Sequence, residues 1–435
     1  MCQSKKMKII KNKTFWLFVA FFIIIWVFNY FSIINLDVIW NYGFSKNFSD
    51  GLLMYKDYNM VITPLYPIVV GTLMKILGSN MIVFYLINAI LATSILYVVY
   101  KLDKKIIMPF MLVILLTSEP NYDLLSTLFL FTLIYFEKEK KNDYLIGIII
   151  GLTFLTKSSI GVFLALPTLC YFKEYKKIIK RVVGFLIPNA LIMIIFLIKG
   201  NLFDYINYAF LGLFDFASGN SSFSIISILS ILIISYFIYQ YIKTKDIENL
   251  YIGLFQVVCI PLFNVSHFIE SLIPVWYYIL KRFKPLKQFY KYALCLAIIP
   301  FIFLIYNAKA TKCNYTNKPF NIRYIQQEYI DDIESLKSFF QDDFDKVHFV
   351  MFEGYLYNIM LDKNPDIYSL SLKGNLGYNG EENFIKKLNN LDKGSIIVTS
   401  SIYQEGQSSE KIYNYINDNY NLIGQFRKFK VFTTN

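Results

Sequence analysis

The chain has 435 residues, of which 56% are hydrophobic and only 17% are charged, whereas soluble domains average about 25% charged residues. This composition excludes an ordinary soluble enzyme, because apolar runs follow one another up to about residue 307 and a normal polar mixture begins only afterwards. The net charge of +12 does not indicate a nucleic-acid partner, since the lysines lie in short clusters between the apolar runs.

The first predicted element is a membrane helix at residues 14–34. It follows the basic sequence "MCQSKKMKIIKNK" and is longer than the apolar part of a signal peptide, with no small-residue cleavage site behind it. We therefore expect it to be retained. A spanning helix needs about 20 mostly apolar residues. The further predicted spans, which bring the total to about eleven, are 81–100, 106–118, 124–136, 144–156, 158–172, 182–198, 223–242, 249–263, 267–280 and 291–307.

Between the first two spans, residues 35–80 form a long loop with two stretches that predict interfacial helices, 38–48 and 65–77. Around "LTKSSIGVF" the apolar pieces are short and predict two half-helices that meet at a polar break. Such a break is tolerated at membrane depth only where protein or water covers the backbone.

The distribution of lysine predicts the orientation. With the N-terminus in the cytoplasm, every cytoplasmic segment is rich in lysine, among them "KLDKK", "EKEKKND", "KEYKKIIKR" and "KRFKPLKQFYK". The opposite segments hold few lysines and most of the acidic residues near the spans. An odd number of spans then places the C-terminal region, residues 308–435, outside the cytoplasm on the side of the first loop.

Residues 308–435 alternate helical and strand-like patterns. The predicted helices are "QQEYIDDIESLKSFFQ", "EENFIKKLNNL" and "SSEKIYNYINDNY", the last with a serine cap. The predicted strands are "KVHFVMF", "GSIIVTS" and a closing strand or hairpin in "LIGQFRKFKVFTT". The fold class is therefore a polytopic α-helical membrane protein, residues 1–307, with a small C-terminal α/β extracytoplasmic domain, residues 308–435. Neither a nucleotide-binding motif nor a Cys/His zinc pattern is present.

Several charged residues stand at the outer ends of different spans. Such groups are costly near a membrane unless they pair or function. The candidates are Asp37, Asp50 and Asp57 in the first loop, Glu119 and Asp123 in the second, Lys157 in the third, and His267 with Glu270 a turn later.

Carboxylates and cations around one cleft suit sugar transfer from a phosphate leaving group. A carboxylate accepts the proton of an attacking hydroxyl, and a cation stabilises the departing phosphate. Structural alternatives exist for each candidate. Asp37 can cap the helix 38–48, Asp50 and Asp57 can form turns, Lys157 can extend to the membrane surface, and His267 with Glu270 can be a helix-end hydrogen bond or a metal pair.

In its order of motifs the chain resembles the membrane-embedded glycosyltransferases of the GT-C superfamily, especially the family 39-like bacterial members related to protein O-mannosyltransferases and lipid A aminoarabinose transferases. Four features carry the resemblance through about residue 307: Asp37 just outside the first helix, "GLLMYKDYNMVITPLYP", the acidic second loop, and "GLTFLTKSSIG". It implies an inverting transferase of the cell envelope in the plasma membrane, which moves a sugar from a polyprenyl-phosphate donor to a glycan, lipid or protein acceptor on the outer face.

The resemblance also implies roles. Asp37 matches the proposed catalytic base, although Val38 stands where the family often has a glutamate. Either Glu119 or Asp123 is the second acid, since no arginine precedes "EPNYD". Lys157 matches the "LTK" lysine and would contact the donor phosphate.

Asp57 and His267 are further candidates for substrate binding. No metal ligand is assigned, although a divalent cation such as Mg²⁺ or Mn²⁺ is possible. Two other classes of function stay open: a transporter or flippase of a lipid-linked saccharide, and a non-catalytic membrane scaffold for polysaccharide assembly.

Overall fold

The structure, a computed structural model, describes residues 13–32, 34–215, 224–259, 265–282, 311–314, 322–372, 375–403 and 408–434. The chain divides into two compact units. Unit 1 comprises residues 1–32, 82–189 and 223–307, and unit 2 comprises residues 33–81, 190–222 and 308–435. Unit 2 thus joins residues 308–435 to two earlier segments of the chain, and the division into domains 1–307 and 308–435 stays a prediction.

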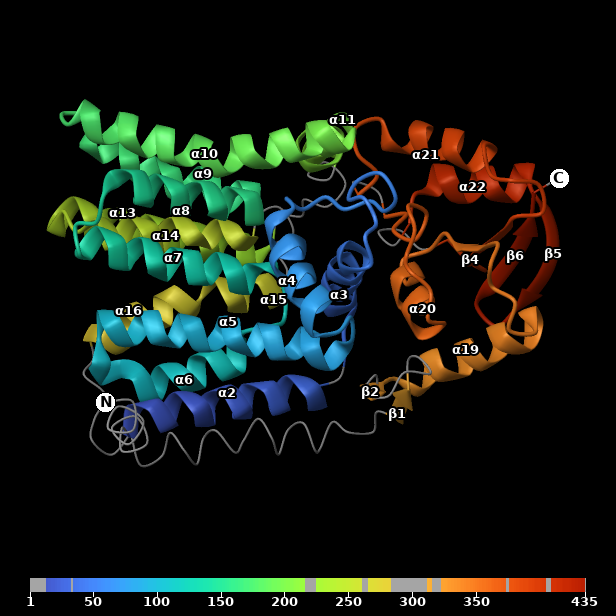
Figure 1. The fold of residues 1–435 in the computed structure, drawn as a ribbon, viewed down its shortest axis with the longest axis horizontal. Coiled ribbons are helices and arrows are strands. Elements are labelled where there is room, and N and C mark those ends of the chain that lie inside the picture. The colour runs from blue at the N-terminus through green and yellow to red at the C-terminus, as the bar shows by residue number, and fades with distance from the viewer. Residues whose placement is uncertain are drawn as a thin grey trace. The chain divides into compact units, whose positions relative to one another are not determined.

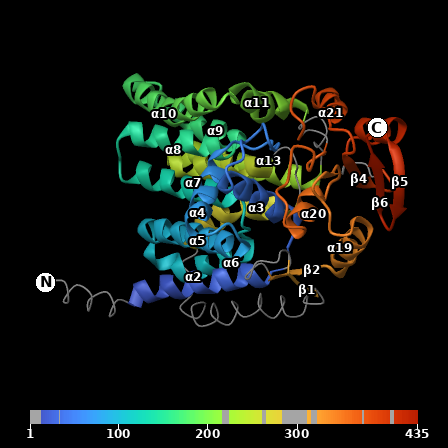
Figure 2. The same ribbon diagram turned by 45° about the vertical axis from the view of Figure 1, so that its right-hand side comes forward.

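Unit 1 is helical, and the axes of its helices, such as α5, α7, α8 and α13, are roughly aligned with one another (Figure 1 and, turned, Figure 2). The helices are α2 (Lys13–Phe31), α5 (Met81–Leu102), α6 (Ile107–Thr117), α7 (Tyr122–Lys138), α8 (Asp143–Thr156), α9 (Ser158–Ala165), α10 (Tyr175–Lys199), α13 (Ile225–Thr244), α14 (Ile247–Leu254), α15 (Val265–Ser271) and α16 (Ile273–Arg282), with 3-10 turns η1 (Lys104–Ile106), η2 (Leu166–Tyr171) and η4 (Phe255–Cys259). The end of α10 extends into unit 2.

These helices coincide with ten of the predicted spans, and the eleventh, 291–307, lies outside the described residues. In the part of the chain that the structure describes, four helices are long and apolar enough to cross a membrane by themselves: α2, α5, α10 and α13. The others are shorter or interrupted, as at Lys157 between α8 and α9 and at Leu272 between α15 and α16. A membrane protein is thus supported, whereas the number of eleven spans stays a prediction.

A buried group of charges ties the helices together at the ends that carry Glu137 and Asp143. Arg181 donates from Nη1 to Glu137 at 2.6 Å and from Nε to Asp143 at 2.9 Å, and its side chain is only 3% exposed. Tyr251 of α14 also donates to Glu137, at 2.8 Å. Because both carboxylates and the guanidinium are paired, this group fastens α7, α8, α10 and α14 to one another.

Unit 2 combines the long first loop with the C-terminal region. Its helices are α3 (Leu36–Ser49), α4 (Leu65–Leu77), α11 (Leu202–Ile206) with the π-turn η3 (Asn207–Leu211), α19 (Gln327–Phe340), α20 (Gly354–Met360), α21 (Gly380–Asn389) and α22 (Glu410–Asn419). Its strands are β1 (Thr311–Asn314), β2 (Ile322–Ile325), β3 (Val347–Phe349), β4 (Ile396–Ser400), β5 (Asn421–Phe426) and β6 (Phe429–Thr433). The two helices predicted in the first loop are present as α3 and α4.

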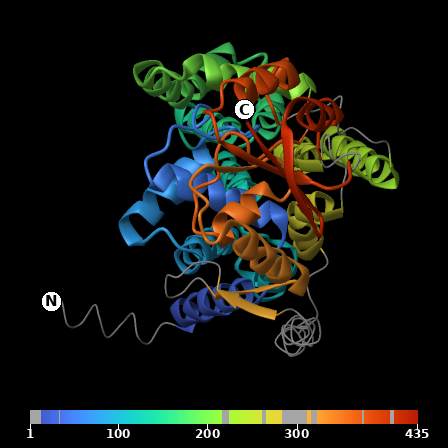
Figure 3. The same ribbon diagram turned by 90° about the vertical axis from the view of Figure 1, so that its right-hand side faces the viewer.

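A four-stranded sheet of order β3-β4-β6-β5 forms the centre of the C-terminal region (Figure 3, where β5 and β6 are red). Strands β3 and β4 are parallel, and the other neighbours are antiparallel. Residues Ile397 and Phe432 pack with α21 and α22 on one face. Because side chains alternate along a strand, Phe349 and Phe429 point to the other face, where both rings contact Tyr357 of α20. The predicted α/β domain is confirmed in its elements, and α20 and the β1-β2 hairpin are additional.

Helix α3 is enclosed by the C-terminal region. Gly43 of α3 approaches Tyr355 of α20 so closely that a Cβ atom on Gly43 would lie 2.5 Å from the tyrosine ring. Asn47 donates to the carbonyl of Pro365 at 2.8 Å, and Asn59 in the following loop donates to the carbonyl of Leu370 at 2.8 Å. The first loop and the C-terminal region are therefore one packed body within unit 2.

Asp332 fastens the β5-β6 hairpin to α19. Its carboxylate is buried and accepts hydrogen bonds from Arg427 Nε and Lys428 Nζ, both at 2.9 Å, and from the Tyr357 hydroxyl at 2.7 Å. Burial acts to lower the pKa of Lys428, but its hydrogen bond and charge interaction with Asp332 outweigh that effect and hold this pKa above its usual value.

We predict that Asp332→Ala lowers the free energy of unfolding by about 3 kcal/mol, because it removes the buried acceptor that two cations and a buried hydroxyl share. The matched control is Asp331→Ala, which removes an exposed carboxylate 3.8 Å from Arg427 and should cost less than about 1 kcal/mol. Thermal unfolding of the purified chain in detergent measures both. Equal midpoints for the two variants would contradict the assigned role of Asp332.

Candidate functional site

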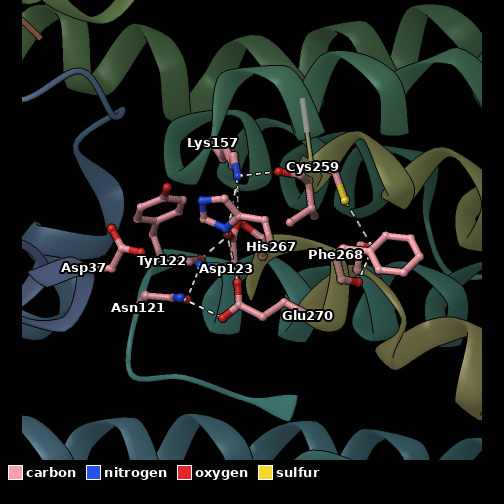
Figure 4. Close-up of polar contacts among 12 residues, drawn as sticks. Asp37, Asn121, Tyr122, Asp123, Lys157, Cys259, His267, Phe268 and Glu270 are labelled. Atoms are coloured by element: carbon pink, nitrogen blue, oxygen red, sulfur yellow. Dashed lines mark hydrogen bonds and ion pairs between the residues drawn. The ribbon is translucent and has the colours of Figure 1, made fainter. Parts of the chain in front are cut away.

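Three separate elements of unit 1 bring polar side chains to one point (Figure 4). Asn121 and Asp123 stand at the start of α7, and Lys157 occupies the one-residue break between α8 and α9. His267 and Glu270 lie one turn apart on α15. We call these five residues the Asp123 cluster.

The start of α7 is built by the sequence "PNYD". The Asn121 side chain caps the helix, because its Oδ1 accepts from the backbone N–H groups of Asp123 at 2.9 Å and Leu124 at 3.3 Å. With the oxygen used in this way, the amide nitrogen Nδ2 donates to Glu270 Oε1 at 2.7 Å. One asparagine thus fixes both the helix start and a carboxylate from another element.

The carboxylate of Asp123 is the centre of the cluster, and its side chain is 1% exposed. Lys157 Nζ lies 3.2 Å from Oδ1 and 3.3 Å from Oδ2. His267 Nδ1 lies 3.2 Å from Oδ2 and 3.4 Å from Glu270 Oε2. A cation and an imidazole therefore compensate a carboxylate that has almost no access to solvent.

Lys157 reaches Asp123 because the chain reverses there. Its extended backbone (φ −151°) ends α8, and α9 then packs against α8 at Gly161, where a Cβ atom would lie 2.3 Å from Phe154 Cα. The ammonium group also donates to the carbonyl of Val258 at 3.0 Å and lies 5.1 Å from the centre of the Tyr122 ring. The predicted polar break at "LTKSSIGVF" is confirmed, and it forms the tip of a helical hairpin.

The charges of the cluster nearly cancel. Asp123 and Glu270 each contribute −1 when ionised, Lys157 contributes +1, and His267 contributes 0 or +1, so that the sum is −1 or 0. All but Lys157 are at most 5% exposed, and the lysine side chain is 14% exposed. With neutral His267 the sum is −1, and the cluster then attracts a cation more strongly than an anion.

Asp123, His267 and Glu270 could hold a metal ion, since one ligand atom from each lies within 4.8 Å of the others. Two of the three distances fit: ligands at 2.0–2.1 Å from one ion are about 2.8–3.4 Å apart in octahedral or tetrahedral geometry, and the His267–Asp123 and His267–Glu270 distances are 3.2 and 3.4 Å. An imidazole nitrogen beside two carboxylates favours a transition metal over Mg²⁺.

The sequence left Glu119 and Asp123 as alternatives for the second acid. The structure places Asp123 inside the cluster. Glu119 is half-buried in the connection before α7, where its carbonyl accepts from the backbone N–H of Asn121 at 2.8 Å. Asp123, Lys157 and His267, proposed from three different loops, are thus brought together.

Asp37 and Asp57 belong to unit 2. Helix α3 begins at Leu36, and its cap is Asn35, whose side chain accepts from Val38 N–H at 2.9 Å. The alternative that Asp37 caps a helix 38–48 is therefore wrong. Asp37 stands in the first turn, where a carboxylate interacts favourably with the helix dipole.

The other two carboxylates of the first loop shape its backbone. Asp57 Oδ2 accepts from Leu53 N–H at 2.7 Å, and Asp50 ends α3 at Gly51 (φ +92°) while pairing with Lys46 at 2.7 Å. The turn predicted from "SDG" is confirmed. The hydrogen bond from Leu53 to the Asp57 carboxylate stabilises the backbone of the same loop.

Sequence reasoning missed Asn121 and undervalued Glu270. Asn121 was not among the candidate residues, although the Asn–x–Asp spacing before an apolar run is typical of a helix cap. Glu270 was paired with His267 alone, and nothing in the sequence connects it to Asn121, 149 residues away.

No protein-family model matches the sequence, and no curated protein matches it. Among solved structures, the chain is similar to ArnT from Cupriavidus metallidurans in the apo state, with a TM-score of 0.55 and 11% identity over 96% of this chain and 97% of that chain. It is also similar to the Archaeoglobus fulgidus oligosaccharyltransferase in complex with zinc and sulfate, with a TM-score of 0.45 and 10% identity over 88% of this chain and 67% of that chain.

The likeness to ArnT shows that the chain shares the fold of that protein. The resemblance predicted from the first loop and the "LTK" motif is supported at the level of the fold.

We predict that Lys157→Met lowers the stability of the protein by about 3 kcal/mol, because it leaves the buried Asp123 carboxylate with only His267 as a compensating side chain. The matched control is Lys281→Met, which breaks a more exposed ion pair with Glu248 (2.7 Å; 31% and 11% exposed) and should cost about 1 kcal/mol or less. Thermal midpoints in detergent compare the two. A Lys157 variant as stable as the control would contradict the assigned compensation.

Proposed function

We propose that this GT-C fold serves a membrane glycosyltransferase, which moves a sugar from a polyprenyl-phosphate donor to an acceptor hydroxyl on the outer face of the plasma membrane. The observation that carries the proposal is the convergence of Asp123, Lys157, His267 and Glu270 from three elements into one buried cluster. Burying four ionisable groups is costly, and in a fold of this kind a phosphate-handling role accounts for it.

In the proposed reaction the acceptor oxygen attacks the anomeric carbon while the bond from that carbon to the phosphate oxygen breaks. The hydroxyl proton passes to a carboxylate, and the electron pair of the broken bond leaves on the lipid phosphate. A single displacement of this kind inverts the configuration at the anomeric carbon. We assign the proton acceptor to Asp37, a role worth about a hundred- to ten-thousand-fold in rate.

Lys157 of the Asp123 cluster would donate to the leaving phosphate, and Asp123 orients its ammonium group. His267, which also lies against Asp123, would either donate to the phosphate or bind a metal. A divalent metal held by Asp123, His267 and Glu270 would supply the positive charge that the nearly neutral cluster lacks. Asn121 then acts as a positioning residue, since its Nδ2 holds the Glu270 carboxylate.

Neither the sugar nor the acceptor is assigned. The assay therefore measures consumption of the lipid-linked donor. Purified protein in liposomes made with bacterial lipid extract is given radiolabelled undecaprenyl-phosphate-linked mannose, glucose or aminoarabinose in separate reactions. Release of undecaprenyl phosphate and label transfer to lipid are then measured. If the folded protein consumes none of these donors, the result contradicts the transferase proposal and favours the transporter or scaffold alternative.

We predict that Asp37→Asn reduces donor consumption at least a hundredfold, since an amide accepts no proton. The matched control is Asp50→Asn, which makes the same change in the same loop at a residue that pairs with Lys46 and should keep activity within about threefold. Wild-type rates in a correctly inserted Asp37 variant would exclude the base role of Asp37, while the transferase proposal would stand on the donor assay.

We predict that the purified protein contains about one transition-metal ion per chain and that Asn121→Ala weakens its retention 10–100-fold, because the second partner of Glu270 is lost. The matched control is Asn142→Ala, which removes another helix cap, one that accepts from Tyr144 N–H at 3.0 Å. Both variants lose about 1 kcal/mol of capping, so that only the difference reports on Glu270. Metal content by mass spectrometry during dialysis against chelator measures it. Equal retention in both variants would contradict the metal assignment.

A further inference from the structure

A groove of about 550 Å³ lies between α2 and α5 in unit 1. Its apolar walls are formed by Phe15, Phe18 and Phe22 of α2 and by Ile90, Tyr97 and Tyr100 of α5. None of these residues belongs to the Asp123 cluster. We call this feature the α2–α5 groove.

The two helices run antiparallel, so that the groove has a defined direction. The ring of Phe18 contacts Tyr97 and Tyr100 near the end of α5, at 6.0 and 5.7 Å between ring centres. At the other end, Trp26 Nε1 donates to the carbonyl of Ile82 at 3.3 Å. From Ile90 to Tyr100 the α5 wall is about 15 Å long at 1.5 Å per residue. The groove is therefore elongated along α5 and is not a compact pocket.

Positive charge stands at one end of this groove. Lys101 Nζ lies 5.3 Å from the centre of the Tyr97 ring, and Lys104 Nζ lies 5.4 Å from that of Tyr100. Both lysines are exposed, and α2 begins at Lys13 beside the groove residue Thr14. The two cations thus sit directly on two aromatic side chains of the groove wall.

Two of the hydroxyl groups in the wall, those of Thr93 and Ser94, are directed to their own helix. Thr93 donates to the carbonyl of Ala89, and Ser94 donates to that of Ile90, both at 2.8 Å. The length of the groove therefore offers apolar contacts, and its charged end offers ammonium groups. A soluble anion would use only the second of these, whereas an anionic lipid would use both.

We propose that the α2–α5 groove binds an anionic glycerophospholipid of the leaflet on the N-terminal side of the membrane. Its phosphate lies between Lys101 and Lys104, and one acyl chain lies along Phe18, Phe22 and Ile90. The site is independent of the proposed catalysis, because it shares no residue with the Asp123 cluster, and it joins the N-terminal half of α2 to α5.

The experiment uses the full-length protein purified in a neutral detergent, with bound lipid counted by native mass spectrometry. Phosphatidylglycerol, phosphatidylcholine and undecaprenyl phosphate are titrated separately and in competition. The variants are Lys101→Ala/Lys104→Ala, which removes the charges, and Ser94→Phe, which fills the groove and keeps them. The control Lys243→Ala/Lys245→Ala removes two lysines from the end of α13, where Lys245 lies over Tyr241 in the same manner, at 5.7 Å.

We expect phosphatidylglycerol to bind in preference to phosphatidylcholine. The Lys101/Lys104 double variant should weaken its binding about 25-fold, at about fivefold for each lysine. Ser94→Phe should abolish the bound lipid, and the α13 control should retain it. Thermal midpoints confirm that each variant is folded.

Three results would overturn the proposal: equal binding of the two phospholipids, equal loss in the α13 control, or displacement of phosphatidylglycerol by undecaprenyl phosphate at a lower concentration. The last would make the groove a polyprenyl-phosphate site. Because donor consumption by the Asp123 cluster is measured separately, failure here does not depend on failure of the proposed transferase.

Discussion

The cost of burying charge governs unit 1. A carboxylate with 1% exposure, as in Asp123, is stable only if cations and hydrogen-bond donors surround it, since an uncompensated charge costs several kcal/mol even after relaxation. Lys157 and His267 meet that requirement for Asp123, and Asn121 meets it for Glu270. Each partner comes from a different part of the chain. The requirement for compensation therefore links the ends of α7, α8 and α15.

A second constraint acts on helix α3, which carries Asp37. Most of its residues are buried within unit 2, and its partners are segments some 300 residues later in the chain: Tyr355 at Gly43 and Pro365 at Asn47. A carboxylate in the first turn of a helix held on several sides has little freedom to move. If Asp37 is the base, the C-terminal region contributes to catalysis by restraining this helix rather than by contacting substrate.

Local patterns were sufficient for most elements. Amphipathic periodicity located α19 and α21, and a serine followed by an apolar pattern located α22, because these signals arise from residues within one or two turns. The short, wholly buried α20 has no polar face and therefore no period to detect. The link of Asn121 to Glu270 and the packing of α3 against α20 depend on long-range contacts. A single sequence describes residues by their order, so that it could suggest the members of the Asp123 cluster but not their distances.

The broken helices of unit 1 and the polar cluster explain one another. Backbone groups freed at a helix break are tolerated at membrane depth only where protein satisfies them. Here the break at Lys157 lets its ammonium group bind the carbonyl of Val258 in η4. Gln256, also in η4, donates to the carbonyl of Ser271 at 2.7 Å, at the end of α15. In an uninterrupted helix, Lys157 could not turn out of the helix toward Asp123. The helix breaks shorten several helices, and the break at Lys157 also allows the charged groups to meet.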